Sequence, residues 1–141
     1  MIILDTNIAS VFLHPQDRWD PAVMSWVESM PRGELHITTI TRAEIAAGVA
    51  VLPDGRRKRE YADRMKKLFA HLEPVTLPFD VACADYYGAV IAARKAAGRP
   101  IAQLDAQIAA IALRHHAAVA TRDTSGFESL GLPIVNPYEA P

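Results

Sequence analysis

Four acidic residues have the types and the spacing that could do chemistry in this sequence: Asp5, Glu44, Asp105 and Asp123. Two carboxylates about 4 Å apart repel by roughly 4 kcal/mol at an effective dielectric near 20. A cluster of them must raise its pKa values, spread apart or bind a cation. Mg²⁺ and Mn²⁺ prefer oxygen ligands, and such an ion can activate water and stabilise charge on a phosphate. If the four acids converge, they predict a divalent-cation site suited to phosphodiester hydrolysis.

The segments around these acids predict that they do converge. Apolar segments that read as strands precede three of the acids: residues 1–4 before Asp5, 35–40 before Glu44, and 117–120 before Asp123. Ligands of open α/β sheets bind outside the carboxyl ends of the strands. Asp105 lies near the start of a helix that leads into the third strand. Because a helix and a strand joined by a short connection run antiparallel, the start of this helix faces the same edge.

The remaining pattern predicts one α/β domain over residues 1–141. Helices are expected from Asp20-Pro21 to Met30, from Thr41 to Pro53, from Arg56 to Leu72, from Asp80 to about Ala97 and from Ile101 to about His115, with short strands at 75–77 and 132–135. Strands that alternate with helices indicate a largely parallel sheet of about five short strands, with helices on both faces.

Each acid also has a structural explanation. Asp5 could cap the helix that follows it, and Thr41-Arg-Ala-Glu44 matches a capping box. Asp105 could be a surface residue favoured by the helix dipole, and Asp123 could form an Asx turn. The coincidence of all four at one sheet edge favours a site over these separate explanations.

A strongly basic segment separates the second and third acids. Residues 55–67 contain seven basic and two acidic residues, a local charge of +5 that leaves −6 on the rest of a chain with formal net charge −1. The segment could be a solvated helix face. It could also contact a phosphate backbone, with Arg56, Arg57, Lys58 and Arg59 as the candidate residues.

Composition excludes several classes of protein. The single cysteine, Cys83, permits no internal disulfide and fits a reducing cytoplasm. We expect no membrane segment, because no apolar run reaches about 18 residues, and no signal peptide. The five histidines show no zinc-binding spacing. A dehalogenase-type phosphatase would need an acid where the chain has Asn7, and a receiver domain would need a lysine beyond Lys95.

The four acidic segments, taken in order, resemble the motifs of PIN-domain nucleases, and most closely those of VapC-type toxins and their FitB-like branch. The similar segments are Ile2–Asn7, Ile40–Gly48, Ile101–Ala110 and Val119–Phe127, followed by Asn136-Pro137. Many members have a further acid where this chain has Gly126. Asp123 is then the only acid of the fourth motif, which leaves open whether one or two metal ions bind.

The resemblance implies an endoribonuclease dependent on Mg²⁺ or Mn²⁺, with tRNA among the candidate substrates. Asp5, Asp105 and Asp123 are the expected metal ligands, Glu44 would orient or deprotonate the attacking water, and Thr6, Asn7 and Thr121 would hold the carboxylates in place. It also implies a cytoplasmic homodimer, a cognate antitoxin, and DNA binding only through that antitoxin. The alternative is a catalytically weak binding protein that acts mainly through the toxin–antitoxin complex.

Overall fold

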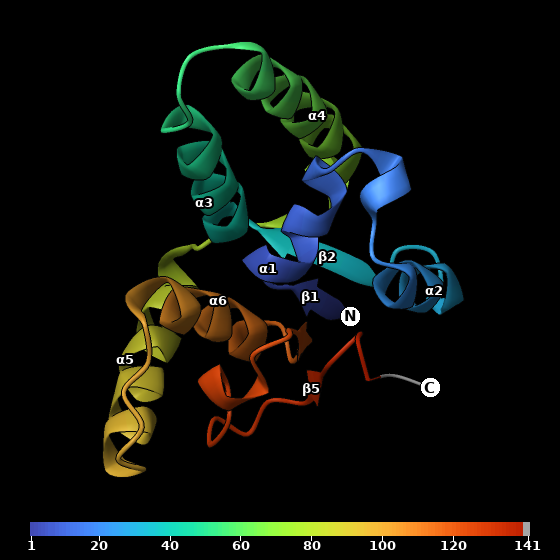
Figure 1. The fold of residues 1–141 in the computed structure, drawn as a ribbon. Helices are drawn as coiled ribbons and strands as arrows, with labels where there is room; N and C mark the ends of the chain where they lie inside the picture. The colour runs from blue at the N-terminus through green and yellow to red at the C-terminus, as the bar shows by residue number, and fades with distance from the viewer. Residues whose placement is uncertain (140–141) are drawn as a thin grey trace.

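A parallel β-sheet forms the centre of the molecule in the computed structural model, which describes residues 1–139 (Figure 1). Its five strands lie in the order β3-β2-β1-β4-β5 and all pair in parallel. The strands are β1 (Ile2–Leu4), β2 (Leu35–Thr38), β3 (Thr76–Leu77), β4 (Ala118–Ala120) and β5 (Ile134–Val135). The predicted α/β fold with a parallel sheet is confirmed.

Six α-helices and four short 3₁₀ helices connect these strands in the described residues. The α-helices are α1 (Thr6–Ala9), α2 (Pro21–Ser29), α3 (Thr39–Ala50), α4 (Arg56–Leu72), α5 (Val81–Ala96) and α6 (Gln103–Arg114). The 3₁₀ helices are η1 (Ser10–Leu13), η2 (Gln16–Arg18), η3 (Glu73–Val75) and η4 (Thr124–Gly126). None of the helices within residues 1–139 is long and apolar enough to cross a membrane.

Alternation along β1 divides the apolar core between the two faces of the sheet. Ile3 packs in a cluster with residues of α5, α6 and β4, including Ile108 and Val119. Leu4 packs in a second cluster with residues of α1, α2 and α3, including Ile8 and Ile45. Successive side chains of a strand point to opposite faces, so β1, buried between two neighbours, needs apolar residues on both. The helices therefore cover both faces, as predicted.

The boundary between β2 and α3 differs from the sequence prediction. The expected strand 35–40 ends at Thr38, and the helix begins at Thr39 rather than Thr41. Thr38 caps this helix, because its side-chain oxygen accepts a hydrogen bond of 3.0 Å from the backbone N–H of Thr41. The alternative explanation of Thr41 and Glu44 as a capping box is therefore wrong, and the Glu44 side chain is available for another contact.

Candidate active site

Asp5 lies at the carboxyl end of the central strand and is 5% exposed. One carboxylate oxygen caps α1 by accepting a hydrogen bond of 2.9 Å from the Ile8 N–H. The other oxygen accepts a hydrogen bond of 2.5 Å from the Thr121 hydroxyl. Burial raises the pKa of Asp5 despite these donors, and the charge of Glu44 raises it further. The capping role and a site role therefore coexist in Asp5.

Thr121 links Asp5 to Asp123. Thr121 follows β4 and is fully buried, and its hydroxyl oxygen also accepts a hydrogen bond of 3.1 Å from the Asp123 N–H. The Asp123 carboxylate accepts a hydrogen bond of 2.7 Å from the hydroxyl of Ser125. The adjacent strands β1 and β4 thereby place the two acids at one edge. Ser125 was not predicted, although a serine two residues after an acid is a usual turn partner.

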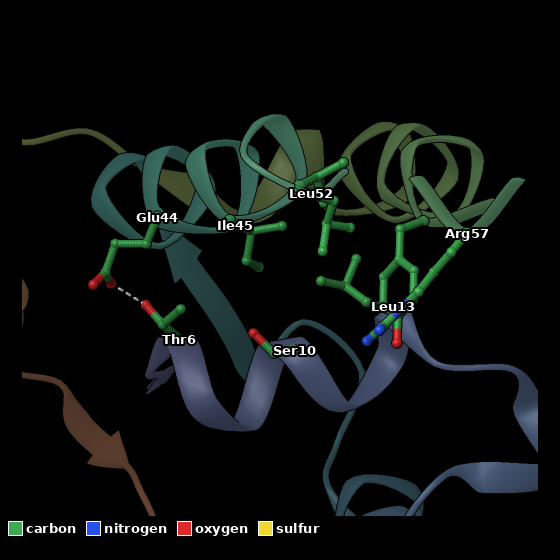
Figure 2. A pocket seen from close by; sticks show the side chains of 10 residues that line it. Thr6, Ser10, Leu13, Glu44, Ile45, Leu52 and Arg57 are labelled. Atoms are coloured by element: carbon green, nitrogen blue, oxygen red, sulfur yellow. Dashed lines mark hydrogen bonds between the residues drawn. The ribbon is translucent and has the colours of Figure 1, made fainter. Parts of the chain in front are cut away.

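Glu44 reaches this edge from α3 on the other side of Asp5. Its carboxylate accepts a hydrogen bond from the Thr6 hydroxyl, which α1 presents (Figure 2). This hydrogen bond holds the Glu44 carboxylate against α1 at the edge of the sheet. Asn7, by contrast, is exposed; only its backbone N–H contributes, by lowering the pKa of Asp5.

Asp105 completes the group from the first turn of α6. It is half-buried, and its side chain makes no hydrogen bond to any residue within 1–139. Burial raises the pKa of Asp105, and the charges of Glu44, Asp5 and Asp123 raise it further, in that order. The other three predicted acids therefore lie within electrostatic reach of Asp105.

None of the four acids forms an ion pair with another residue of 1–139. The ion pairs of residues 1–139 involve other carboxylates, such as Glu34, Glu60 and Glu73. No three of the described histidine, cysteine, aspartate and glutamate side chains are already arranged around a common metal position. The carboxylates would have to turn toward an ion, but an uncompensated set of oxygen donors fits Mg²⁺ or Mn²⁺.

Gly126 occupies the position where many PIN-domain nucleases have a further acid. A Cβ atom at this position would lie 3.7 Å from a carboxylate oxygen of Asp123. An acidic side chain at position 126 would lie beside Asp123 and add a second negative charge that could bind a cation. With glycine, Asp123 is the one acid of this turn.

A groove of about 200 Å³ begins beside Glu44 and runs between α1, η1, α3 and α4 (Figure 2). Its lining includes Thr6, Ser10, Leu13, Glu44, Arg57 and Tyr61. Of the four basic residues predicted to contact RNA, Arg57 is the one that lines the groove. Arg56 pairs with Glu60 and Lys58 pairs with Asp54. The sequence could not show this difference, because it depends on how α4 is rotated against its neighbours.

Comparisons with known proteins show which family this chain resembles. The family model of the PIN domain matches residues 2–131. The chain is 38% identical to "VapC ribonuclease Y4jK" of Sinorhizobium fredii, over 99% of both proteins. It is 37% identical to "Toxin FitB" of Neisseria gonorrhoeae, over 98% of this chain and 99% of the relative.

A solved structure described as "Structure of FitAB bound to IR36 DNA fragment" has the same fold. It superposes with a TM-score of 0.90 at 35% identity, covering 100% of this chain and 98% of the other. The predicted resemblance is confirmed along nearly the full length. The chain therefore belongs to the PIN-domain family, among its VapC- and FitB-type members.

Proposed function

We propose that this protein is a metal-dependent endoribonuclease that acts as the toxin of a toxin–antitoxin pair, with the whole chain forming one nuclease domain. The observation that supports this most directly is the group of four acids at the carboxyl edge of the sheet, none paired with a basic side chain within residues 1–139. Such a group is costly unless a cation binds. The activity named for the VapC relative points the same way.

In this proposal Asp5, Asp105 and Asp123 hold Mg²⁺ or Mn²⁺. The ion would supply an activated water and stabilise charge on the phosphate. Glu44, held by Thr6, orients the water or takes its proton. Thr121 fixes Asp5 and the backbone of Asp123.

The RNA substrate would approach along the groove beside Glu44. Arg57 lines that groove, and α4, which carries Arg57, contains six further arginine and lysine residues. Single-stranded RNA needs cations along its backbone, so the groove suits an RNA strand, with tRNA among the candidates.

The relatives also suggest the protein's partners. A relative is named a toxin, and the solved FitAB assembly is bound to a DNA fragment. We propose that this chain binds a cognate antitoxin, contacts DNA only through it, forms a homodimer and works in the cytoplasm.

A cleavage assay with a matched pair of variants tests the nuclease. Asp105→Asn removes one charge and little volume at the site, whereas Asp85→Asn makes the same change at an exposed position of α5. With labelled RNA and a Mg²⁺ or Mn²⁺ titration, we expect Asp85→Asn to cleave like the wild type and Asp105→Asn to lose cleavage. Full cleavage by Asp105→Asn would refute the assignment. A wild type that binds RNA and antitoxin without cleaving would favour the binding-protein alternative.

A further inference from the structure

We propose that Arg94 is a positioning residue that holds the two chain segments bearing Asp105 and Asp123 in the arrangement needed to bind the metal. This inference rests on the proposed metal-dependent function. Arg94 lies in the last turns of α5, which packs beside α6 (Figure 1). It was not singled out from the sequence, where an arginine near the end of a helix reads as a complement to the helix dipole.

Arg94 carries a buried positive charge that no anionic side chain neutralises within the described part of the chain. It is 4% exposed, and no carboxylate within residues 1–139 forms an ion pair with it. Its Nε–H has no hydrogen-bond partner there. Desolvating a guanidinium is costly, and an apolar side chain of similar volume is often as stable or more stable. Packing alone therefore does not explain an arginine at this position.

The contacts of the guanidinium explain it better. One terminal nitrogen, Nη1, donates hydrogen bonds of 3.0 Å to the Ser125 carbonyl and 2.8 Å to the Glu128 carbonyl. The other, Nη2, makes a longer contact of 3.5 Å with the Pro100 carbonyl. Arg94 thus joins three segments: the end of α5, the loop before α6, and the turn that follows β4.

Two of these segments lead directly to proposed metal ligands. The Ser125 backbone that Arg94 holds carries the hydroxyl that donates to the Asp123 carboxylate. Pro100 precedes α6, whose first turn contains Asp105. A change at Arg94 should therefore disturb the metal ligands without touching substrate.

Two apolar residues later in the same turn attach it to the core independently of Arg94, so the loss of Arg94 should affect the position of the turn without unfolding the protein. Phe127 and Leu130 are buried in the core cluster that includes Ile108. They attach residues 127–130 to the fold whether or not Arg94 is present. Arg94 is needed instead for the more exposed part of the turn, where Asp123 and Ser125 lie.

Three variants test this role. Arg94→Met keeps an unbranched side chain in the buried position but removes every donor. Ser125→Ala, at an exposed position, removes the hydrogen bond that the Ser125 hydroxyl donates to the Asp123 carboxylate. Arg99→Gln is the control, because Arg99 is an exposed residue whose ion pair with Glu128 touches the same turn. The measurements are Mn²⁺ affinity by calorimetry, kcat and KM for RNA cleavage, thermal stability, and amide hydrogen exchange of residues 122–128.

We expect Arg94→Met to weaken Mn²⁺ binding and lower kcat by roughly 10–100-fold, the usual effect of losing a group that orients metal ligands. KM for RNA should stay unchanged, and exchange should accelerate in residues 122–128 but not in β1 or β4. Ser125→Ala should change Mn²⁺ affinity and kcat in the same direction and less. Arg99→Gln should behave like the wild type.

Wild-type Mn²⁺ affinity and kcat in Arg94→Met would overturn the proposal. If Arg94→Met does not fold, Ser125→Ala tests the proposal instead. Unchanged Mn²⁺ affinity in Ser125→Ala would then overturn the proposal. If the wild type itself neither binds Mn²⁺ nor cleaves RNA, the nuclease proposal fails separately. Hydrogen exchange then still tests positioning: acceleration in Arg94→Met alone supports it, and unchanged exchange refutes it.

Discussion

Asp105 and Asp5 differ in how their carboxylates are held, and this difference predicts different effects on stability. Both have raised pKa values, mainly because of burial. Asp5 accepts hydrogen bonds from Ile8 and Thr121, whereas Asp105 accepts none from residues 1–139. We predict that Asp105→Asn stabilises the metal-free protein at pH 7, because it removes repulsion and loses no hydrogen bond. Asp5→Asn should stabilise the protein less, or destabilise it, because the amide nitrogen of the new asparagine cannot accept the hydrogen bond that Thr121 donates to Asp5.

The pH dependence of that stabilisation follows from the direction of the pKa shift. The unfolded pKa of an aspartate is about 3.9, and the folded pKa of Asp105 is higher. Between the two values the folded protein binds more protons, so its free energy of unfolding falls as the pH rises. The advantage of Asp105→Asn should therefore be absent below about pH 4 and complete above the folded pKa. Urea unfolding in EDTA at several pH values, with Asp85→Asn as the control, measures this. A pH-independent difference would contradict it.

At the scale of single residues, the side-chain contact of Glu44 could not be predicted from the sequence. Local spacing matched a capping box, but the cap is Thr38, three residues before Thr41. Several threonines near one helix start compete for the same backbone donors, and the sequence does not rank them. The contact that Glu44 makes instead, with Thr6, joins residues 38 positions apart. The positions of three acids were predictable because each follows a strand or lies in the first turn of a helix, and Glu44 lies within the first two turns of α3. Their hydrogen-bond partners were not predictable.

At the scale of elements, α4 was predicted with its observed bounds because its apolar stripe and its flanking residues agree. Its rotation about its own axis is set by contacts with α3 and η1, which the sequence does not reveal. Both arginines are exposed, but that rotation places Arg57 in the lining of the groove and leaves Arg56 outside it, in an ion pair with Glu60. These two adjacent arginines form a natural matched pair.

We predict that Arg57→Gln weakens binding to all RNAs, whereas Arg56→Gln has little effect. If Arg57 contacts one phosphate, its loss should reduce the slope of log affinity against log salt concentration by about 0.7, the value for a single strand. Fluorescence anisotropy measures this slope for Arg57→Gln and for Arg56→Gln, each combined with Asp105→Asn so that the RNA is not cleaved. Equal effects of the two substitutions would indicate a diffuse electrostatic surface instead of a contact in the groove.

At the scale of the whole molecule, a largely parallel sheet of about five strands was predictable because strands alternate with helices along the sequence. The strand order β3-β2-β1-β4-β5 was not predicted. The chain is nearly neutral overall, yet it concentrates acids at that edge and bases on α4. This separation of charge favours two kinds of ligand: a cation, and a protein segment that presents one.

The last prediction concerns that protein segment. An arginine guanidinium pairs with carboxylates through two parallel hydrogen bonds, so it can take the place of the metal at acids that form no ion pair within residues 1–139. We predict that the cognate antitoxin inserts an arginine or lysine toward Asp5, Asp105 and Asp123. Replacing that residue with alanine should weaken inhibition by roughly 2–5 kcal/mol, as for other buried charge pairs.

Thermodynamic linkage between Mn²⁺ binding and antitoxin binding provides a second test of this prediction. If the basic side chain and the metal compete for the same carboxylates, raising Mn²⁺ must weaken antitoxin binding, and antitoxin must weaken Mn²⁺ binding by the same factor. Calorimetric titration of antitoxin into the protein at increasing Mn²⁺ measures the first effect, and the alanine variant of the antitoxin should no longer show it. If antitoxin affinity is indifferent to Mn²⁺ and to the basic residue, inhibition must come from covering the groove beside Glu44, where Arg57 would otherwise meet the RNA.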